Sequence, residues 1–339
     1  MKIIIVGPNF VGGGLEKVKM LSAFLQSIGH QVVVISLPGQ TLEDKAWYYY
    51  QRARTHLGSN EERYFKKAAD LLEKKIKKIG CDALICVETR LSYVLTRDLN
   101  CLKIFSCESL IDELYFSKDF TDLNVFRKLR EMELEIFSKS DYVLFPWETT
   151  ENYVRKYLWQ GNNLVTIRHG CTPSKKRASP FFPPSIITLG SLGFYWSNRE
   201  LLSDLTRLSP YRIDAYGHYK PPSKFGINFK GYARSMDLLC NYQFGLNTIS
   251  KDVFRQNHFS SRVLAYLSYG LPVLSPDWMK FSNSLKGVLP YNENNFLEVV
   301  EEYSDSEKWA RISDAAYQQA LELDWHEVLK PLQRIIPLE

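Results

Sequence analysis

Short continuous hydrophobic runs alternate along the chain with longer segments of helical periodicity. The first run, residues 3–7, precedes a glycine-rich turn and a segment in which hydrophobic residues recur every three or four positions. A second run then follows at 31–36. Runs that are apolar at every position are typical of parallel strands buried on both faces. The pattern predicts a β-loop-α-β unit, which opens a doubly wound α/β fold.

The same alternation continues and then restarts after a polar segment. Further strands are expected near 81–88, 102–109, 141–145 and 163–170, with a helix over 125–138. Residues 172–185 are rich in Pro, Ser and charge and predict a linker. We therefore expect an N-terminal Rossmann-like domain over 1–171, a second one over 186–315 and a C-terminal helix within 316–339. Two such halves suggest a ligand cleft between them.

Composition narrows the class of protein. The 339 residues are 45% hydrophobic with a net charge of +5, which predicts a globular protein and does not require nucleic acid. No apolar run has the length of a membrane span, and the opening strand does not resemble a signal peptide. We expect a cytoplasmic protein. The six cysteines form no CxxC pair and predict buried free thiols, not a zinc site.

The stretch 257–278 contains the strongest chemical pattern. Ser260 and Ser261 are good N-cap residues, Arg262 follows in the first turn, and Gly270 with Pro272 predicts the helix end and a following strand. Helix-start N–H groups, two hydroxyls and a guanidinium together suit a phosphate group. An ordinary helix–strand unit of an α/β core is the alternative.

This stretch resembles the donor-binding motif of GT-B glycosyltransferases. In that motif, Ser261 stands at the usual Asn position, Arg262 at Lys and Tyr266 at Tyr, and the Gly-x-Pro-Val ending is present. Ser140-Asp141-Tyr142-Val143 and the turn ending at His169-Gly170 also resemble family patterns. The resemblance implies two Rossmann-like domains with parallel sheets facing a cleft, a UDP-linked sugar donor, and a terminal helix that crosses back to the first domain.

The resemblance also assigns residues to the donor and to the acceptor side. The N–H groups of the 190–193 loop would hold the diphosphate. Tyr232 would stack on the base, or alternatively pack in the core. The expected donor-binding residues are Gly190, Ser191, Gly193, Tyr232, His258, Ser260, Ser261, Arg262 and Tyr266. Those expected on the acceptor side are Gly13, Gly14, Glu16 and His169. The loop at Gly12-Gly13-Gly14 lacks the spacing of a dinucleotide fingerprint and could also be a plain tight turn.

Two departures from the family pattern bear on mechanism. The retaining members carry a Glu-x7-Glu pair, and this chain has Asn257 and Ala265 at those positions. This favours an inverting transfer with one general base, for which Glu108 is the first candidate, followed by Asp112 and Glu113. An ordinary acidic loop is the alternative for each of them. The absence of an Asp-x-Asp motif from the sequence favours a metal-independent reaction, and no cofactor is expected.

Residues 47–78 mix aromatic and basic residues and end in a lysine-rich amphipathic helix. A solvated helix packed on the sheet is one interpretation. A peripheral contact with an anionic membrane, which would suit a lipid-linked acceptor, is the other. The overall hypothesis is a transferase that moves a sugar from a nucleotide-sugar to a glycan or lipid-linked glycan. The alternatives are a nucleotide-sugar epimerase on the same fold and a non-catalytic relative that binds a nucleotide-sugar.

Overall fold

The computed structural model describes residues 1–8, 13–37, 61–116, 122–180, 183–190, 192, 197–218 and 220–337. The chain divides into two compact units. The first consists of Met1–His169 together with the chain from Leu329 onward, and the second is Gly170–Val328.

A parallel sheet forms the centre of the first unit. Its strands in the described residues are β1 (Lys2–Pro8), β2 (Gln31–Leu37), β3 (Ala83–Val87), β4 (Leu102–Ser106), β5 (Tyr142–Phe145) and β6 (Leu164–Thr166). Their order is β2-β1-β3-β4-β5-β6, and every neighbouring pair is parallel. Ile3, Ile4 and Ile5 of β1 are completely buried. The strands predicted from the apolar runs are confirmed.

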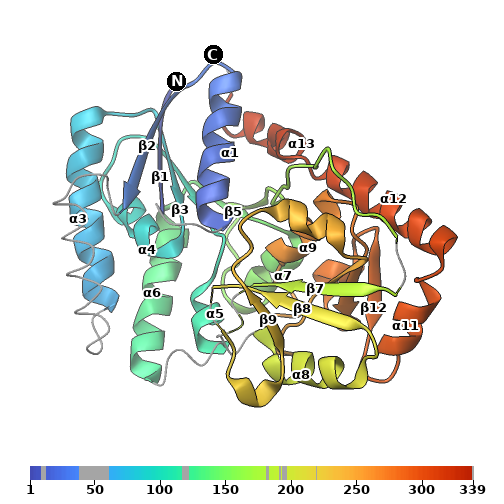
Figure 1. Cartoon of the computed structure of the whole chain (residues 1–339). Coiled ribbons are helices and arrows are strands. Elements are labelled where there is room, and N and C mark those ends of the chain that lie inside the picture. Colours follow the sequence, from blue (N-terminus) through green and yellow to red (C-terminus); the bar gives the residue numbers. More distant parts are fainter. Residues whose placement is uncertain are drawn as a thin grey trace. The chain divides into compact units, whose positions relative to one another are not determined.

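Helices cover both faces of this sheet. They are α1 (Gly13–Ser27), α3 (Glu61–Ile79), α4 (Thr89–Ser92), α5 (Ile111–Phe116), α6 (Leu123–Lys139) and α7 (Glu148–Tyr157), with the 3-10 turns η1 (Tyr93–Thr96) and η5 (Lys330–Arg334). α1 lies on one side of the first strands and α3 on the other (Figure 1). Gly7 permits the close packing of α1, because a Cβ atom there would lie 2.3 Å from Val18 Cγ2.

The second unit is built on another parallel sheet. Its strands are β7 (Ser185–Leu189), β8 (Arg212–Tyr216), β9 (Asn228–Gly231), β10 (Phe244–Leu246), β11 (Val273–Pro276) and β12 (Val288–Tyr291). The order β12-β11-β10-β7-β8-β9 is that of a Rossmann fold. β8 and β9 lie on one side of β7, whereas β10, β11 and β12 lie on its other side. The carboxyl ends of β7 and β10 therefore mark the switch point where such folds bind ligands. The sequence did not predict β12, a short strand that contains Pro290.

Several helices and 3-10 turns accompany the second sheet. They are α8 (Arg199–Leu208), η3 (Ser223–Phe225), η4 (Met236–Asn241), α9 (Ser261–Ser268), α10 (Lys280–Asn283), α11 (Phe296–Glu302), α12 (Ser306–Glu322) and α13 (Trp325–Leu329). The segment 320–336, expected as one helix, is divided between α12, α13 and η5. Cys171 interrupts it: its N–H donates to Leu323 O, and its carbonyl accepts from Trp325 N. In the described part of the chain, the helices are too short or too polar to cross a membrane.

Candidate functional site

Arg262 lies at the switch point of the second sheet. It occupies the first turn of α9, and its Nη1 donates to the carbonyl of Thr248, just after β10, at 3.3 Å. Its guanidinium also lies against Gly190, just after β7, where a Cβ atom would come within 2.4 Å of Nη2. Gly190 has φ +134°, a conformation that side-chain-bearing residues rarely adopt. Burial lowers the pKa of Arg262, but an arginine stays charged at any physiological pH.

Arg255 adds a second buried cation beside Arg262. It is 2% exposed, and its guanidinium lies 5.2 Å from the ring centre of Phe254. Its charge is one of the causes that lower the pKa of Arg262, after burial. The two positive charges repel each other, so an anion bound near both would be favoured. Arg255 was not predicted from the sequence, because it lies outside the α9 motif in a turn without a recognisable pattern.

The start of α9 is polar, although its two serines differ in their surroundings. Ser260 is the N-cap residue, but its hydroxyl makes no capping bond and instead donates to Asn247 Oδ1 at 3.5 Å. Ser261 is exposed. His258 is buried and stacks on Phe254, with ring centres 4.8 Å apart. As predicted, α9 stops just before Gly270, which adopts the left-handed conformation with φ +62°.

The two tyrosines expected in the donor site lie in different environments. Tyr266 is fully buried, and its hydroxyl accepts from Leu189 N at 2.8 Å and donates to Leu246 O at 3.3 Å. It links β7 to β10 inside the core, so its side chain cannot face a ligand. Tyr232 is 52% exposed and stacks on His218, with ring centres 4.3 Å apart, next to the ends of β8 and β9. Ser191 and Gly193 lie outside the described residues.

Glu108 is the centre of a charged cluster in the first unit. It follows β4, and its Oε1 lies 3.4 Å from Lys17 Nζ of α1. Its Oε2 lies 3.0 Å from His169 Nδ1, and the Ser106 hydroxyl donates to Oε1 at 3.0 Å. Burial by itself would raise the pKa of Glu108, but the charge of Lys17 and the hydrogen bond with His169 outweigh it and lower that pKa to about 2. Glu108 is therefore an ionised carboxylate at neutral pH.

The partners of Glu108 come from distant parts of the chain. Lys17 is 1% exposed and His169 is 2% exposed, and both are brought to the carboxyl end of β4 by the parallel sheet. Because an ionised carboxylate only accepts hydrogen bonds, the His169 proton in this contact lies on Nδ1. His169 was predicted as a site residue. Lys17 was not, because in the sequence it cannot be distinguished from an ordinary surface lysine of a helix.

The other two acidic candidates differ from Glu108. Asp112 is buried, accepts from the Tyr153 hydroxyl at 2.7 Å and pairs with Arg130. Arg130 also lies 3.4 Å from Glu133, whose pKa burial raises to about 7. Asp112 thus belongs to a buried network between α5, α6 and α7. Glu113 lies in the first turn of α5 and is half-buried.

Two further features follow the carboxyl ends of strands β1 and β3 in the first sheet. Gly13 and Gly14 open α1, and Glu16 is exposed in its first turn. Glu88, directly after β3, has φ +82° although it carries a side chain. Such a conformation costs about 1–3 kcal/mol and is frequent near functional sites. In the sequence, Glu88 is recognisable only as the end of a predicted strand. Its backbone conformation adds it to the candidate site residues.

The comparisons with known proteins bear on the fold. No protein-family model and no curated protein matches the chain. A sucrose-phosphate synthase from Thermosynechococcus elongatus superposes with a TM-score of 0.75 at 11% identity over 99% of this chain and 98% of that chain. A glycosyltransferase from Rickettsia africae gives 0.66 at 15% identity over 100% and 99%. Anabaena HepE in complex with UDP and glucose gives 0.65 at 12% identity over 99% of both chains. Together with the two parallel sheets, these likenesses show that the chain has the two-unit GT-B α/β fold, as predicted.

Proposed function

We propose that this protein is a glycosyltransferase that moves a sugar from a UDP-linked donor to a glycan or lipid-linked acceptor. The observation that carries the proposal is Arg262, a cation held against Gly190 and Thr248 at the switch point of the second sheet. A glycine at this point lets a phosphate approach the backbone closely. Solved structures of the same fold are described as complexes with UDP and with UDP-glucose, which supports UDP as the donor nucleotide.

In this proposal the second unit holds the donor. Arg262 and Arg255 neutralise the diphosphate, with help from the N–H groups and the two serines at the start of α9. The N–H groups of the 191–193 loop are expected to bind the diphosphate as well, although Ser191 and Gly193 lie outside the described residues. Tyr232, stacked on His218, offers an exposed aromatic face for the base. Tyr266 is left out of the ligand contacts, because its hydroxyl is used within the core.

In the inverting reaction proposed here, the acceptor hydroxyl attacks the anomeric carbon while the bond from that carbon to the diphosphate breaks. The negative charge that develops on UDP is stabilised by Arg262, which requires no metal ion. The acceptor proton passes to the Glu108–His169 pair. A carboxylate whose pKa is about 2 is a weak base. We therefore assign the proton to His169 Nε2, with Glu108 fixing the proton on Nδ1.

Transfer can be tested by UDP release. The protein is incubated with UDP-glucose and other UDP-sugars, with and without a panel of glycan and lipid-linked glycan acceptors. We expect UDP to appear faster when a competent acceptor is present, together with a product of higher mass. Formation of an isomeric UDP-sugar without UDP release would instead identify an epimerase. Tight nucleotide-sugar binding without any turnover across the panel would identify a non-catalytic relative.

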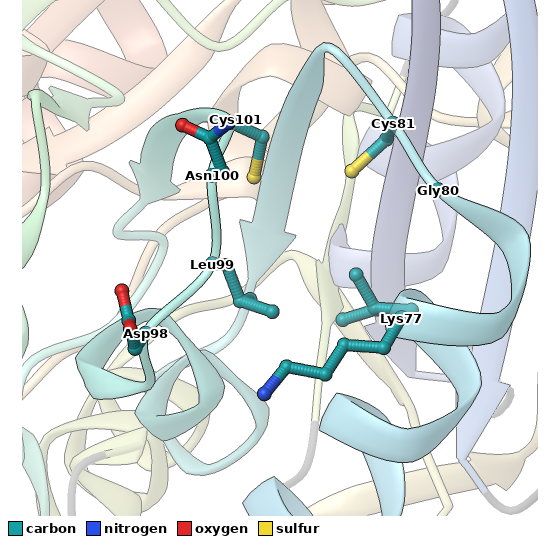
Figure 2. Close-up of a pocket in the computed structure, with 8 residues that line it drawn as sticks. Lys77, Gly80, Cys81, Asp98, Leu99, Asn100 and Cys101 are labelled. Carbon is teal, nitrogen blue, oxygen red and sulfur yellow. The ribbon is translucent and has the colours of Figure 1, made fainter.

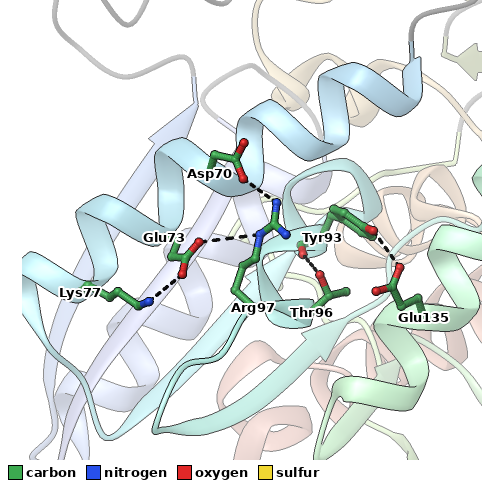
Figure 3. Close-up of polar contacts among 7 residues, drawn as sticks. All are labelled: Asp70, Glu73, Lys77, Tyr93, Thr96, Arg97 and Glu135. Atoms are coloured by element: carbon green, nitrogen blue, oxygen red, sulfur yellow. Dashed lines mark hydrogen bonds and ion pairs between the residues drawn. The ribbon is translucent and has the colours of Figure 1, made fainter.

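The lysine-rich helix α3 supports a contact with an anionic membrane, and we propose it as the acceptor-side anchor. Part of its charge is already neutralised, because Lys66 pairs with Glu62 and Lys77 with Glu73 at 2.6 and 2.7 Å. Figure 3 shows a similar arrangement in which Arg97 contacts Asp70 and Glu73. Lys74 and Lys78 are exposed on the same helix. Residues 47–60 of the predicted contact lie outside the described residues.

We expect the protein to float with liposomes that contain anionic lipid and not with neutral liposomes. The double substitution Lys74→Glu/Lys78→Glu should weaken flotation, because each lysine near such a surface contributes about 1 kcal/mol. The double substitution Lys286→Glu/Lys308→Glu makes the same charge change on the second unit and serves as the control. Equal flotation on neutral and anionic liposomes would contradict the proposed contact with an anionic membrane.

A further inference from the structure

Two cysteines share a cavity at the amino edge of the first sheet. The cavity has a volume of about 330 Å³ and is lined by the end of α3, the turn into β3 and the turn into β4. Cys81 and Cys101 are both half-buried and both line it. Figure 2 shows their sulfur atoms directed into the space between the two turns, above Leu99 and Lys77.

The backbone holds the two cysteines near each other. Asp82, next to Cys81, accepts from Leu102 N at 2.9 Å, and Leu102 is next to Cys101. Asp82 N in turn donates to Lys2 O at 2.8 Å. Cys101 stands immediately before β4 and Cys81 stands two residues before β3. The ladder pairs Ala83 with Leu102, so the two cysteines are offset by one residue and their separation is fixed by the backbone. The two thiols hydrogen-bond to each other.

The hydrogen bond makes the two thiols unequal. Donation from Cys81 lowers the pKa of Cys101, and the nearby charge of Lys103 adds to this effect. The same bond, with burial, raises the pKa of Cys81. Cys101 is thus the thiol that ionises first. Cys86 and Cys107 differ from both, because each is buried in the core and burial raises its pKa.

We propose that Cys81 and Cys101 form an oxidisable dithiol, which a hydroperoxide converts to an intramolecular disulfide. The Cys101 thiolate attacks one peroxide oxygen, the O–O bond breaks, and a sulfenic acid forms while the other oxygen leaves as an alcohol or as water. Cys81 sulfur then attacks the sulfenic sulfur, the S–S bond forms and water leaves. The two thiols lose two electrons and the hydroperoxide gains them. The cavity gives the oxidant access to both sulfur atoms.

The disulfide would form at the opposite edge of the sheet from Glu108. Cys81 and Cys101 precede β3 and β4, whereas Glu108 follows β4. The cross-link would enclose β3, α4 and η1 without involving any residue assigned above to the donor or the acceptor. The proposal therefore stands or falls independently of glycosyl transfer.

The test is oxidation of the whole folded protein with hydrogen peroxide, followed by alkylation of the remaining thiols and tryptic digestion without reductant. Trypsin cleaves after Arg90 and Arg97, so Cys81 and Cys101 fall on separate peptides. We expect a linked peptide pair whose mass is lower than the sum by two hydrogen atoms, with fragment ions that assign the bond to Cys81 and not to Cys86. The Cys240→Ser variant, which changes a half-buried thiol of the second unit, should give the same pair. Both cysteines fully alkylated after peroxide treatment would overturn the proposal.

Single substitutions test the order of the two steps. In Cys81→Ser the resolving thiol is gone, so a sulfenic acid should accumulate at Cys101 and be trapped by dimedone. In Cys101→Ser the trapping at Cys81 should be lower, because burial still raises the pKa of Cys81, whereas Cys101 in Cys81→Ser keeps the nearby charge of Lys103 that lowers its pKa. Equal or reversed trapping would contradict the assignment. Oxidation in urea should abolish the preference for this pair, because the preference depends on the folded ladder. A linked pair that forms equally well in the unfolded chain would also count against the proposal.

Discussion

Glu108→Gln should reduce the rate of transfer by about 10²–10⁴-fold, the range typical of a lost acid–base group, while the affinity for UDP stays unchanged. The glutamine amide cannot hold the proton of His169 on Nδ1 by charge, and it no longer balances the buried Lys17. Because the pKa of Glu108 is about 2, this carboxylate stays ionised above about pH 4. The wild-type rate should therefore not fall through protonation of Glu108 in that range. Steady-state kinetics over a pH series, with UDP affinity measured in parallel, check both statements.

Controls separate this role from a loss of folding. Glu148→Gln changes a surface carboxylate of the same unit that pairs with Arg168 at 2.7 Å, and it should leave kcat near the wild-type value. His169→Asn removes the imidazole that takes up the proton and should impair transfer to a similar extent. The lowered pKa of Glu108 stabilises the fold above its unfolded value of 4.5, and this contribution is lost as the pH falls toward 2. If Glu108→Gln folded normally and kept full activity, Glu108 would not be needed to position His169 for the acceptor proton.

Arg262→Ala should lower kcat/KM for the UDP-sugar by about 10²-fold or more, because it removes a charge that stabilises the departing diphosphate. The structure gives a reason for a large effect: the guanidinium is held by the Thr248 carbonyl and by its contact with Gly190, so little conformational freedom is lost on binding. Both the KM for the donor and kcat should change. Donor titrations of the purified variant measure the two parameters separately.

The matched control for this prediction is Arg207→Ala. Arg207 lies on α8 of the same unit, is 75% exposed and pairs with Asp204 at 2.8 Å, so its removal should not affect the donor. Arg262→Lys keeps the charge but not the planar pair of donors, and it should be intermediate. Gly190→Ala should resemble Arg262→Ala, because the added Cβ would displace the guanidinium. Donor kinetics unchanged in Arg262→Ala would exclude the phosphate role.

Much of the fold could be predicted because each buried parallel strand is an uninterrupted apolar run. β1 and β2 were predicted within a residue or two for this reason. The short strand β12 was missed, since Val288–Tyr291 contains a proline and only a brief apolar run. The division of the final helical segment was missed as well, because it depends on Cys171, which lies far away in the sequence.

The candidate site was only partly predictable for a related reason. Arg262 could be found because a helix start, a glycine and a proline mark its position locally. Lys17, Arg255 and the strained Glu88 have no such local mark, and their importance depends on which strand ends the fold brings together. Tyr266 was predicted to bind the donor because it matches a tyrosine of the GT-B motif, but the helical pattern places it in the core. It lies on the same face as Val263 and Leu267, which are buried with it.

The most direct test of a UDP-sugar transferase with Arg262 at its donor site is thermal unfolding in the presence of UDP, GDP, ADP and CMP. Any ligand that binds only the folded state raises Tm by mass action. We predict that UDP raises the Tm of the wild-type protein and of Arg207→Ala, that the other nucleotides raise it less, and that Arg262→Ala loses the effect of UDP. If none of the four nucleotides raised Tm, or if UDP stabilised Arg262→Ala as strongly as the wild type, the account of the donor site would be contradicted.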